Sequence, residues 1–264
     1  MGTPFRTALS RTTGWLADRT IPRPLRASVY RGYARATGAD LSEVRLPLAE
    51  HPSLGAFFVR RLKEGARPIE RDPARFVSPV DGTVQSLCPL ERGSLLQAKG
   101  KPYSVSELLG GHEDPALEGG FSWTIYLSPR DYHRIHAHED CRLTRAHWLA
   151  GSLYSVAPSV LARRMVLPVN ERVALRLESP RGHFWLVLVG ATNVGRMRVV
   201  GLETGREGAI APPLAFARGA ELARFEMGST IVLLAPRGLA APLADLREGA
   251  KLKLGEPIGR YLGA

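Results

Sequence analysis

Three short segments of the chain carry side chains that could act together as a nucleophile, a base and an acid. The segment Gly228-Ser229-Thr230 places a serine directly before the apolar run of residues 231–234, which is typical of a buried strand. Because glycine has no Cβ, the backbone beside Ser229 is open to close approach. Residues 78–82 (Ser-Pro-Val-Asp-Gly) supply a carboxylate, and residues 132–136 (Tyr-His-Arg-Ile-His) supply two imidazoles.

Asp81, His136 and Ser229 together have the composition of an activated nucleophile. An imidazole with a near-neutral pKa can remove the proton of the serine hydroxyl, and a carboxylate can orient that imidazole. The nearest carbonyl is that of Gly228 on the same backbone, so attack there would turn a peptide bond into an ester. Each residue also has a simpler explanation, since Asp81 and Ser229 are common turn residues and one of the histidines can merely pack.

These segments, in this order, resemble the motifs of the phosphatidylserine decarboxylase family, which has a Pro-x-Asp-Gly turn, a Tyr-His-Arg-x-His motif and a Gly-Ser-Thr near the C-terminus. Other segments of the chain resemble the family as well: residues 57–60, 67–69, 97–100, 126–131, 170–173 and 189–192. Two features depart from many members. Met227 stands where leucine is frequent, and residues 137–140 (Ala-His-Glu-Asp) replace a segment that contains proline.

The resemblance implies a proenzyme that cuts itself between residues 228 and 229, giving a β chain (1–228) and an α chain (229–264) that stay together as a non-covalent heterodimer. Asp81, His136 and Ser229 are then the self-processing triad. Ser229 becomes a pyruvoyl group, which forms a Schiff base with phosphatidylserine and accepts the electron pair left by CO2, so that phosphatidylethanolamine is formed. The resemblance also implies His133 as the proton donor of this second reaction.

Binding of the acidic headgroup is expected from basic residues near the motifs, namely Lys99, Arg130 and Arg134. No metal ion is expected. A competing interpretation is a zinc endopeptidase, because His136-Ala137-His138 is a pair of imidazoles two residues apart and Asp81 could add a ligand. That interpretation leaves Gly-Ser-Thr unexplained. A third is a basic membrane-binding module without catalytic activity.

The charge distribution indicates a membrane surface as a partner. The chain has a net charge of +11, and residues 1–40 hold seven arginines against two aspartates, interleaved with aromatic residues and leucines. This mixture is typical of segments that lie on anionic lipid, although a helical region packed on its own domain has the same composition. Pro22 and Pro24 divide the region into two pieces.

Other sequence features narrow the cellular context. The chain has neither an apolar run long enough to span a bilayer nor the pattern of a signal peptide, and no nucleic-acid motif is present. We therefore expect a peripheral protein on the cytoplasmic side of the cell membrane, with Cys88 and Cys141 as free buried thiols. The sequence leaves a higher homo-oligomer open.

The spacing of apolar residues predicts an α+β fold, with a mainly antiparallel β body and an N-terminal helical region. We expect residues 1–66 to be helical and membrane-associating, and residues 67–264 to form the catalytic β-rich domain. Helices are predicted at 41–48, 54–62, 104–109 and 156–162. Strands are predicted at 82–87, 95–98, 122–127, 141–147, 172–179, 183–189, 196–202, 221–225 and 230–234, with two more within 246–261.

Overall fold

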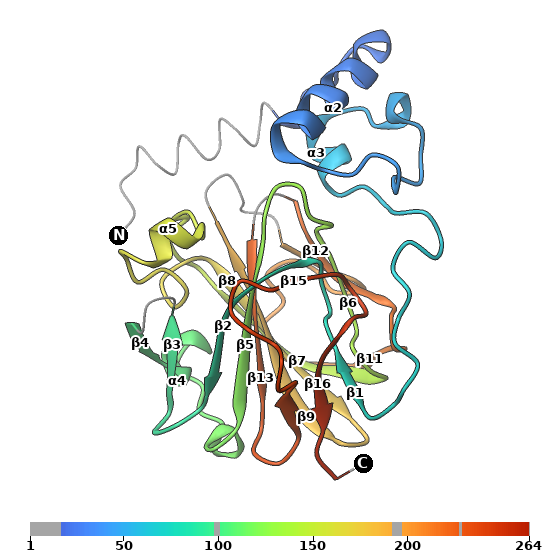
Figure 1. The fold of residues 1–264 in the computed structure, drawn as a ribbon. Helices are drawn as coiled ribbons and strands as arrows, with labels where there is room; N and C mark the ends of the chain where they lie inside the picture. Colours follow the sequence, from blue (N-terminus) through green and yellow to red (C-terminus); the bar gives the residue numbers. More distant parts are fainter. Residues whose placement is uncertain (1–16, 98–100, 192–196, 227–228, 264) are drawn as a thin grey trace.

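An eight-stranded antiparallel sheet forms the centre of the protein (Figure 1). The computed structural model describes residues 17–97, 101–191, 197–226 and 229–263. The strand order is β11-β7-β8-β9-β13-β5-β2-β15. In chain order these strands are β2 (Gly82–Pro89), β5 (Phe121–Leu127), β7 (Cys141–Leu149), β8 (Arg172–Ser179), β9 (Gly182–Gly190), β11 (Gly208–Phe216), β13 (Ser229–Ala235) and β15 (Lys251–Leu252). The predicted fold class is confirmed.

Two three-stranded sheets contribute to the core on one face of the main sheet. One is β1 (Arg75–Val77), β16 (Pro257–Tyr261) and β14 (Ala240–Pro242), and the other is β10 (Met197–Val199), β12 (Glu221–Phe225) and β6 (Arg134–His136). We call the apolar layer shared by these three sheets the first core. It includes Ile135 and Phe225 from the small sheets and Ile231 and Leu233 from β13.

The opposite face of the main sheet packs against short elements. They are the hairpin β3 (Ser94–Gln97) and β4 (Lys101–Ser104), the helices α4 (Val105–Leu108) and α5 (Pro158–Leu161), and the 3-10 helix η3 (Pro115–Leu117). This second core takes Val232 and Leu234 from β13. Successive side chains of a strand point to opposite faces, so a strand covered on both sides must be apolar throughout. This explains the continuous apolar run of residues 231–234.

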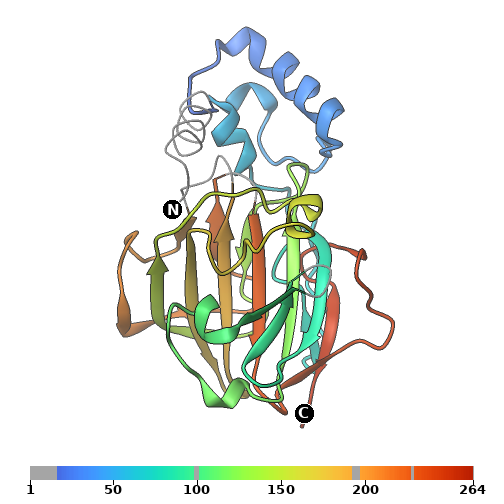
Figure 2. The ribbon, with the colours of Figure 1, turned by 90° about the vertical axis from the view of Figure 1, so that its left-hand side faces the viewer.

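The N-terminal part of the described chain lies beyond one end of the main sheet (Figure 2). It contains α2 (Arg23–Thr37), the 3-10 helix η1 (Leu48–Glu50) and α3 (Leu54–Phe58). Helix α2 begins directly after Pro22, where proline costs no hydrogen bond, and ends at Gly38 in the left-handed conformation. A small separate core of Tyr30, Val44 and Phe57 holds these elements together.

Most predicted strands are confirmed within two residues at each end, but the helix at 41–48 is wrong. Residues 41–47 form turns, because Val44 pairs with Leu62 in an isolated β-bridge and the neighbouring backbone bonds across to residues 61 and 63. The same pairing ends α3 at Phe58 instead of residue 62. The prediction missed β1, β4, β6, β11 and β14.

Two further expectations concern the whole chain. Cys88 and Cys141 are buried thiols that form no disulfide, as predicted. Among the residues that the structure describes, no helix combines the length and apolar character needed to cross a bilayer.

Candidate active site

Ser229 is the first residue of the central strand β13, where it lies between Leu127 of β5 and Gly190 of β9. By alternation it shares the strand face of Ile231 and Leu233, which is the face of the first core. Its side chain is fully buried, and its Oγ has no hydrogen-bond partner among the described residues. A buried hydroxyl without a partner costs about 1–3 kcal/mol, so its position at the start of the central strand calls for an explanation.

The ring of His133 lies at the same end of the sheet and also has an unpartnered atom. Its Nδ1 donates to the carbonyl of Asp131 at 2.9 Å, while its buried Nε2 has no partner in the described structure. Burial lowers the pKa of His133 to about 3. Contacts with the backbone of Asp131 and Leu127 raise this pKa but offset only part of the shift. Leu127 is directly opposite Ser229. The structure therefore places a neutral imidazole and the serine hydroxyl at one end of the β5–β13 pair.

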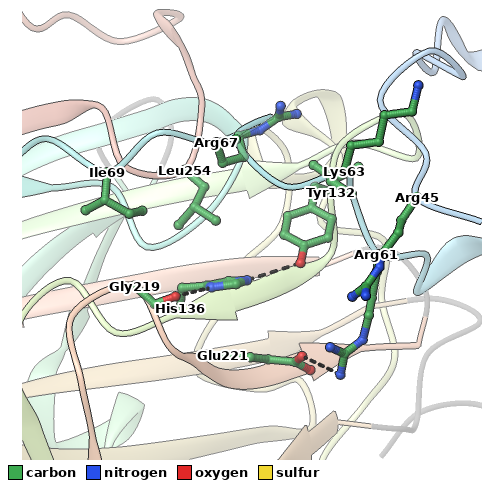
Figure 3. Close-up of a pocket in the computed structure, with 12 residues that line it drawn as sticks. Arg45, Arg61, Lys63, Arg67, Ile69, Tyr132, His136, Gly219, Glu221 and Leu254 are labelled. Atoms are coloured by element: carbon green, nitrogen blue, oxygen red, sulfur yellow. Dashed lines mark hydrogen bonds and ion pairs between the residues drawn. The ribbon is translucent and has the colours of Figure 1, made fainter.

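His136 is held in a fixed orientation on β6. Its backbone N–H donates to the carbonyl of Pro79 at 2.9 Å, which joins this motif to the Pro-Val-Asp-Gly turn. Its Nδ1 lies 2.8 Å from the carbonyl oxygen of Gly219 and its Nε2 lies 3.2 Å from the hydroxyl of Tyr132 (Figure 3). A carbonyl only accepts, so the proton is on Nδ1 and Nε2 keeps its lone pair.

The ionisation of both partners favours this arrangement. Burial raises the pKa of Tyr132 to about 12, so the phenol keeps its proton and donates to Nε2 of His136. Burial also lowers the pKa of His136, which keeps the imidazole neutral near pH 7. His136 is therefore a neutral group with a basic nitrogen, as a general base requires.

Asp81 contacts an arginine instead of His136. Its carboxylate accepts from Arg67 at 2.7 and 2.6 Å and from the backbone N–H of Leu254 at 2.9 Å. No hydrogen bond joins Asp81 to His136 in the described structure; its charge acts on that imidazole only from a distance. The expectation that the carboxylate orients the imidazole therefore does not hold in this structure, because Gly219 and Tyr132 do so.

The glycine after Asp81 has a clear structural reason. A Cβ at Gly82 would lie 2.6 Å from the carbonyl oxygen of Tyr126, closer than real contacts allow. Only glycine lets β2 run this close to β5 at the point where the chain leaves Asp81.

A cavity of about 300 Å³ adjoins His136 and Tyr132 and has a basic wall (Figure 3). Four cationic side chains line it: Arg45, Arg61, Lys63 and Arg67. Arg61 reaches Glu221 at 3.5 Å and Arg67 is paired with Asp81. Arg45 and Lys63 form no ion pair within the described part of the chain, so their charge is available to an anion. The prediction did not assign these residues to the site. The Arg-Arg-Leu-Lys run at 60–63 signals Arg61 and Lys63, and Arg67 lies in the segment 67–69 that resembles the family.

The three basic residues predicted to bind substrate have other positions. Arg134 is buried and donates to Glu221 at 2.6 Å and to the carbonyl of Val59 at 2.7 Å, which argues against a role in binding because its donors are occupied. Arg130 lies 3.7 Å from Asp131 and does not line the cavity. Lys99 and Gly228 are outside the described residues.

The structure gives no support to the zinc endopeptidase interpretation. His138 is buried, with its ring 4.7 Å from that of Phe76 and 4.0 Å from that of Phe184. In the described ranges, neither His136 nor His138 belongs to a group of three side chains that could hold a metal ion.

The sequence is similar to known proteins over most of its length. A family model described as phosphatidylserine decarboxylase matches residues 54–260. A phosphatidylserine decarboxylase proenzyme of Myxococcus xanthus is 37% identical over 263 residues, covering 96% of this chain and 94% of the relative. Proenzymes with the same name from Anaeromyxobacter sp. and Acidovorax ebreus are 38% and 39% identical and cover 96% and 97% of this chain and 94% of each relative.

Proposed function

The chain belongs to the phosphatidylserine decarboxylase family, and from this premise we propose that it is a proenzyme that cuts its own backbone and then decarboxylates phosphatidylserine to phosphatidylethanolamine and CO2. The observation that carries the proposal is the position of Ser229. Its hydroxyl is buried at the start of the central strand and has no hydrogen-bond partner in the described part of the chain, and the ring of His133 lies at the same strand end. No zinc peptidase or binding module explains that arrangement.

In the proposed cleavage, Ser229 Oγ attacks the carbonyl carbon of Gly228. The hydroxyl proton passes to an imidazole, for which we propose His136 once its Nε2 has exchanged the bond from Tyr132 for one from the serine hydroxyl. The imidazole returns this proton to the leaving nitrogen as the peptide C–N bond breaks, which gives an ester and a free amine. Arg67 and Asp81 support this step indirectly, because their ion pair fixes the turn whose Pro79 carbonyl holds the backbone of His136.

The ester then undergoes β-elimination, in which the former Ser229 Oγ leaves as part of the Gly228 carboxylate and residue 229 becomes dehydroalanine. Tautomerisation to an imine and hydrolysis by one water molecule then release ammonia and leave a pyruvoyl group at residue 229. Position 229 is buried, and its side-chain oxygen has no hydrogen-bond partner among the described residues. When formed, the pyruvoyl group supplies an electron sink for the pair left by the departing CO2.

The proposed role of His133 as a proton donor needs one added step. In the described structure, its only ring proton is on Nδ1 and is committed to the carbonyl of Asp131. Its Nε2, which has no partner among the described residues, carries a lone pair and no proton, and burial lowers the pKa of the ring to about 3. His133 must therefore take up a proton at Nε2 before it can give one to the product, or its surroundings must change after the cut.

The basic wall of the cavity supports a role in binding the substrate headgroup. Phosphatidylserine carries a phosphate and a carboxylate, and Arg45 and Lys63 offer unpaired charges beside His136. We propose that they hold the anionic headgroup in place of the Arg130 and Arg134 predicted from sequence. Substitution of either residue should raise the KM and make it less dependent on salt, because one screened attraction is lost, without slowing self-cleavage.

Helix α2 supports attachment to the membrane surface. Leu25 is 56% exposed and Val29 is 41% exposed, one turn apart on the same face, and Arg31 and Arg35 are exposed along the same helix. An exposed apolar stripe beside arginines suits the interface of an anionic bilayer. We propose that the protein is peripheral on the cytoplasmic side, with the N-terminal helical region touching the lipid.

Intact-mass measurement of the purified chain tests the proposal. Wild-type protein should give fragments of residues 1–228 and 229–264, the smaller one blocked to N-terminal sequencing. Ser229→Ala should stay whole and inactive, while the control Ser122→Ala, which changes another buried serine on the neighbouring strand β5, should still be cut. Cleavage in Ser229→Ala would refute the mechanism. Activity on free serine but not on phosphatidylserine would refute the lipid substrate.

A further inference from the structure

Three side chains that the proposed reaction does not use converge on the other face of the main sheet. They are His147 on β7, Glu207 just before β11, and His112 in the loop between α4 and η3. One potential ligand atom from each lies within 4.8 Å of the other two. Elsewhere in the described chain there is no comparable group of three histidine, cysteine or acidic side chains.

His147 and Glu207 are already fixed relative to each other. Nδ1 of His147 lies 2.6 Å from one carboxylate oxygen of Glu207, and the backbone N–H of Trp148 donates to the other oxygen at 2.7 Å. These contacts outweigh the effect of burial and lower the pKa of Glu207, which therefore offers a full negative charge. His147 itself is 2% exposed, so its position leaves little freedom.

His147 also carries a polar atom that the protein leaves unsatisfied. Its Nε2 is buried and has no hydrogen-bond partner in the described structure. The ring of His112 stacks on the ring of His147, with the ring centroids 3.6 Å apart and an angle of 25° between the ring planes. Stacking of the two imidazole rings does not satisfy the buried Nε2 of His147.

We propose that His112, His147 and Glu207 form a binding site for one divalent transition-metal ion of the zinc class. Two imidazoles and a carboxylate are the nitrogen and oxygen ligands that zinc takes in proteins, with water in the fourth position. Ligand bonds of about 2.0–2.2 Å place tetrahedral ligand atoms about 3.4 Å apart. The ion takes the place of the proton between Nδ1 of His147 and Glu207, so their 2.6 Å contact must open slightly, and the ring then carries its proton on Nε2. The half-exposed His112 ring must also turn out of its stack on His147, because a metal ion binds an imidazole nitrogen in the plane of the ring. The sequence had led us to expect no metal.

This site is separate from the proposed active site. On successive strands His147 pairs with Ala174, Ala174 with Val187, and Val187 with Val232 of β13. His147 is therefore three strands away from β13, on the face of the main sheet that packs in the second core. Ser229 is three residues along β13 from Val232 and faces the first core. Strand spacing and rise put the two sites about 17 Å apart. The ion would therefore fasten the 110–114 loop to the sheet edge and stabilise the fold, without taking part in decarboxylation.

Calorimetric titration of the untagged full-length protein with Zn²⁺, and with Co²⁺ monitored by its visible absorption, tests the site. We expect one equivalent to bind and the thermal midpoint to rise with metal. His112→Ala and Glu207→Gln should each weaken binding at least tenfold, since even loss of a supporting contact around a metal costs 10–100-fold. Both positions border solvent, so both variants should fold.

Two matched controls separate this site from casual surface binding. Glu203→Gln removes an exposed carboxylate four residues from Glu207, and His183→Asn removes an imidazole that is already paired with Asp114. Both should bind as the wild type does. The proposal is overturned if no stoichiometric binding occurs, if His112→Ala and Glu207→Gln bind normally, or if His183→Asn loses affinity as much as they do.

Discussion

The buried neutral state of His133 predicts a specific dependence of stability on pH. The pKa of this histidine falls from its ordinary value of 6.5 to about 3 in the folded protein because its ring is fully buried. The unfolded chain therefore binds a proton at higher pH than the folded chain does. Stability from this residue is complete above pH 6.5 and is lost as the pH falls toward 3.

The size of the effect follows from the shift. Each pKa unit is worth 1.36 kcal/mol, so the whole shift corresponds to about 5 kcal/mol. Between pH 7.5 and pH 5.0 the unfolded state gains its proton while the folded state does not, which removes about 2 kcal/mol of unfolding free energy. Other buried histidines, such as His136 and His138, act in the same direction, so the total loss in the wild-type background is larger.

The comparison of His133→Asn with its parent isolates this one residue. Asparagine can still donate to the carbonyl of Asp131 but does not titrate. Both chains should carry Ser229→Ala, so that each remains a single polypeptide whose urea unfolding reaches equilibrium. Measured at pH 7.5 and 5.0, the parent should lose about 2 kcal/mol more than His133→Asn.

Equal losses in the two chains would refute the assignment. Such a result would mean that His133 takes up a proton in the folded protein as readily as in the unfolded chain, and that its Nε2 reaches water or an acceptor. The same result would remove the requirement that His133 be protonated during the reaction before it can act as a donor.

Other perturbations test the surroundings of the site and the membrane contact. Arg67→Gln leaves the buried Asp81 carboxylate without its cation and should lower the free energy of urea unfolding by about 3–5 kcal/mol. Adding Asp81→Asn should restore part of this loss, and an equal loss with and without Asp81→Asn would contradict the pairing. The self-cleavage rate of freshly folded chain, followed on gels, should be constant above pH 6.5 and fall in acid, because the pKa of His136 is lowered and its neutral form is the base. A rate that rises in acid would exclude that role. Leu25→Gln with Val29→Gln should weaken co-sedimentation with anionic vesicles about tenfold, and unchanged binding would exclude α2 as the contact.

The strands of the main sheet were predictable because both of its faces are covered. The uninterrupted apolar run of β13 and the apolar residues of β9 reflect burial on two sides, which a local pattern reveals. Strand β11 escaped prediction because it contains Pro212 and Pro213, which remove backbone donors, and its pairing with β7 shifts register at that point. Strand β6 is three residues long and carries Arg134 and His136, so it has no apolar signature.

The composition of the site was predictable, but its contacts were not. The motifs name Asp81, His136 and Ser229 as chemical types, and nothing in their spacing shows that Asp81 binds Arg67. That pairing depends on how the connector after α3 folds back on the β2 turn. The helix predicted at 41–48 failed for a related reason, since its backbone pairs with residues 61–63, which no local pattern reveals.

The burial of Ser229 is best understood as a cost that the reaction removes. A hydroxyl without a partner destabilises the folded chain by about 1–3 kcal/mol, and ordinary selection for stability would replace it. The strand holds it there nonetheless, because residues 229–235 pair with β5 and residues 229–234 pair with β9 without a register shift. In the proposed reaction the hydroxyl disappears when residue 229 becomes a carbonyl, so the unfavourable burial lasts only until the chain is cut. The orphaned oxygen is thus better explained by chemistry than by packing. Adding Ser122→Ala to the uncut Ser229→Ala chain should lower its stability, because a hydroxyl bonded to the carbonyl of Cys88 is lost, whereas Ser229→Ala itself breaks no hydrogen bond among the described residues.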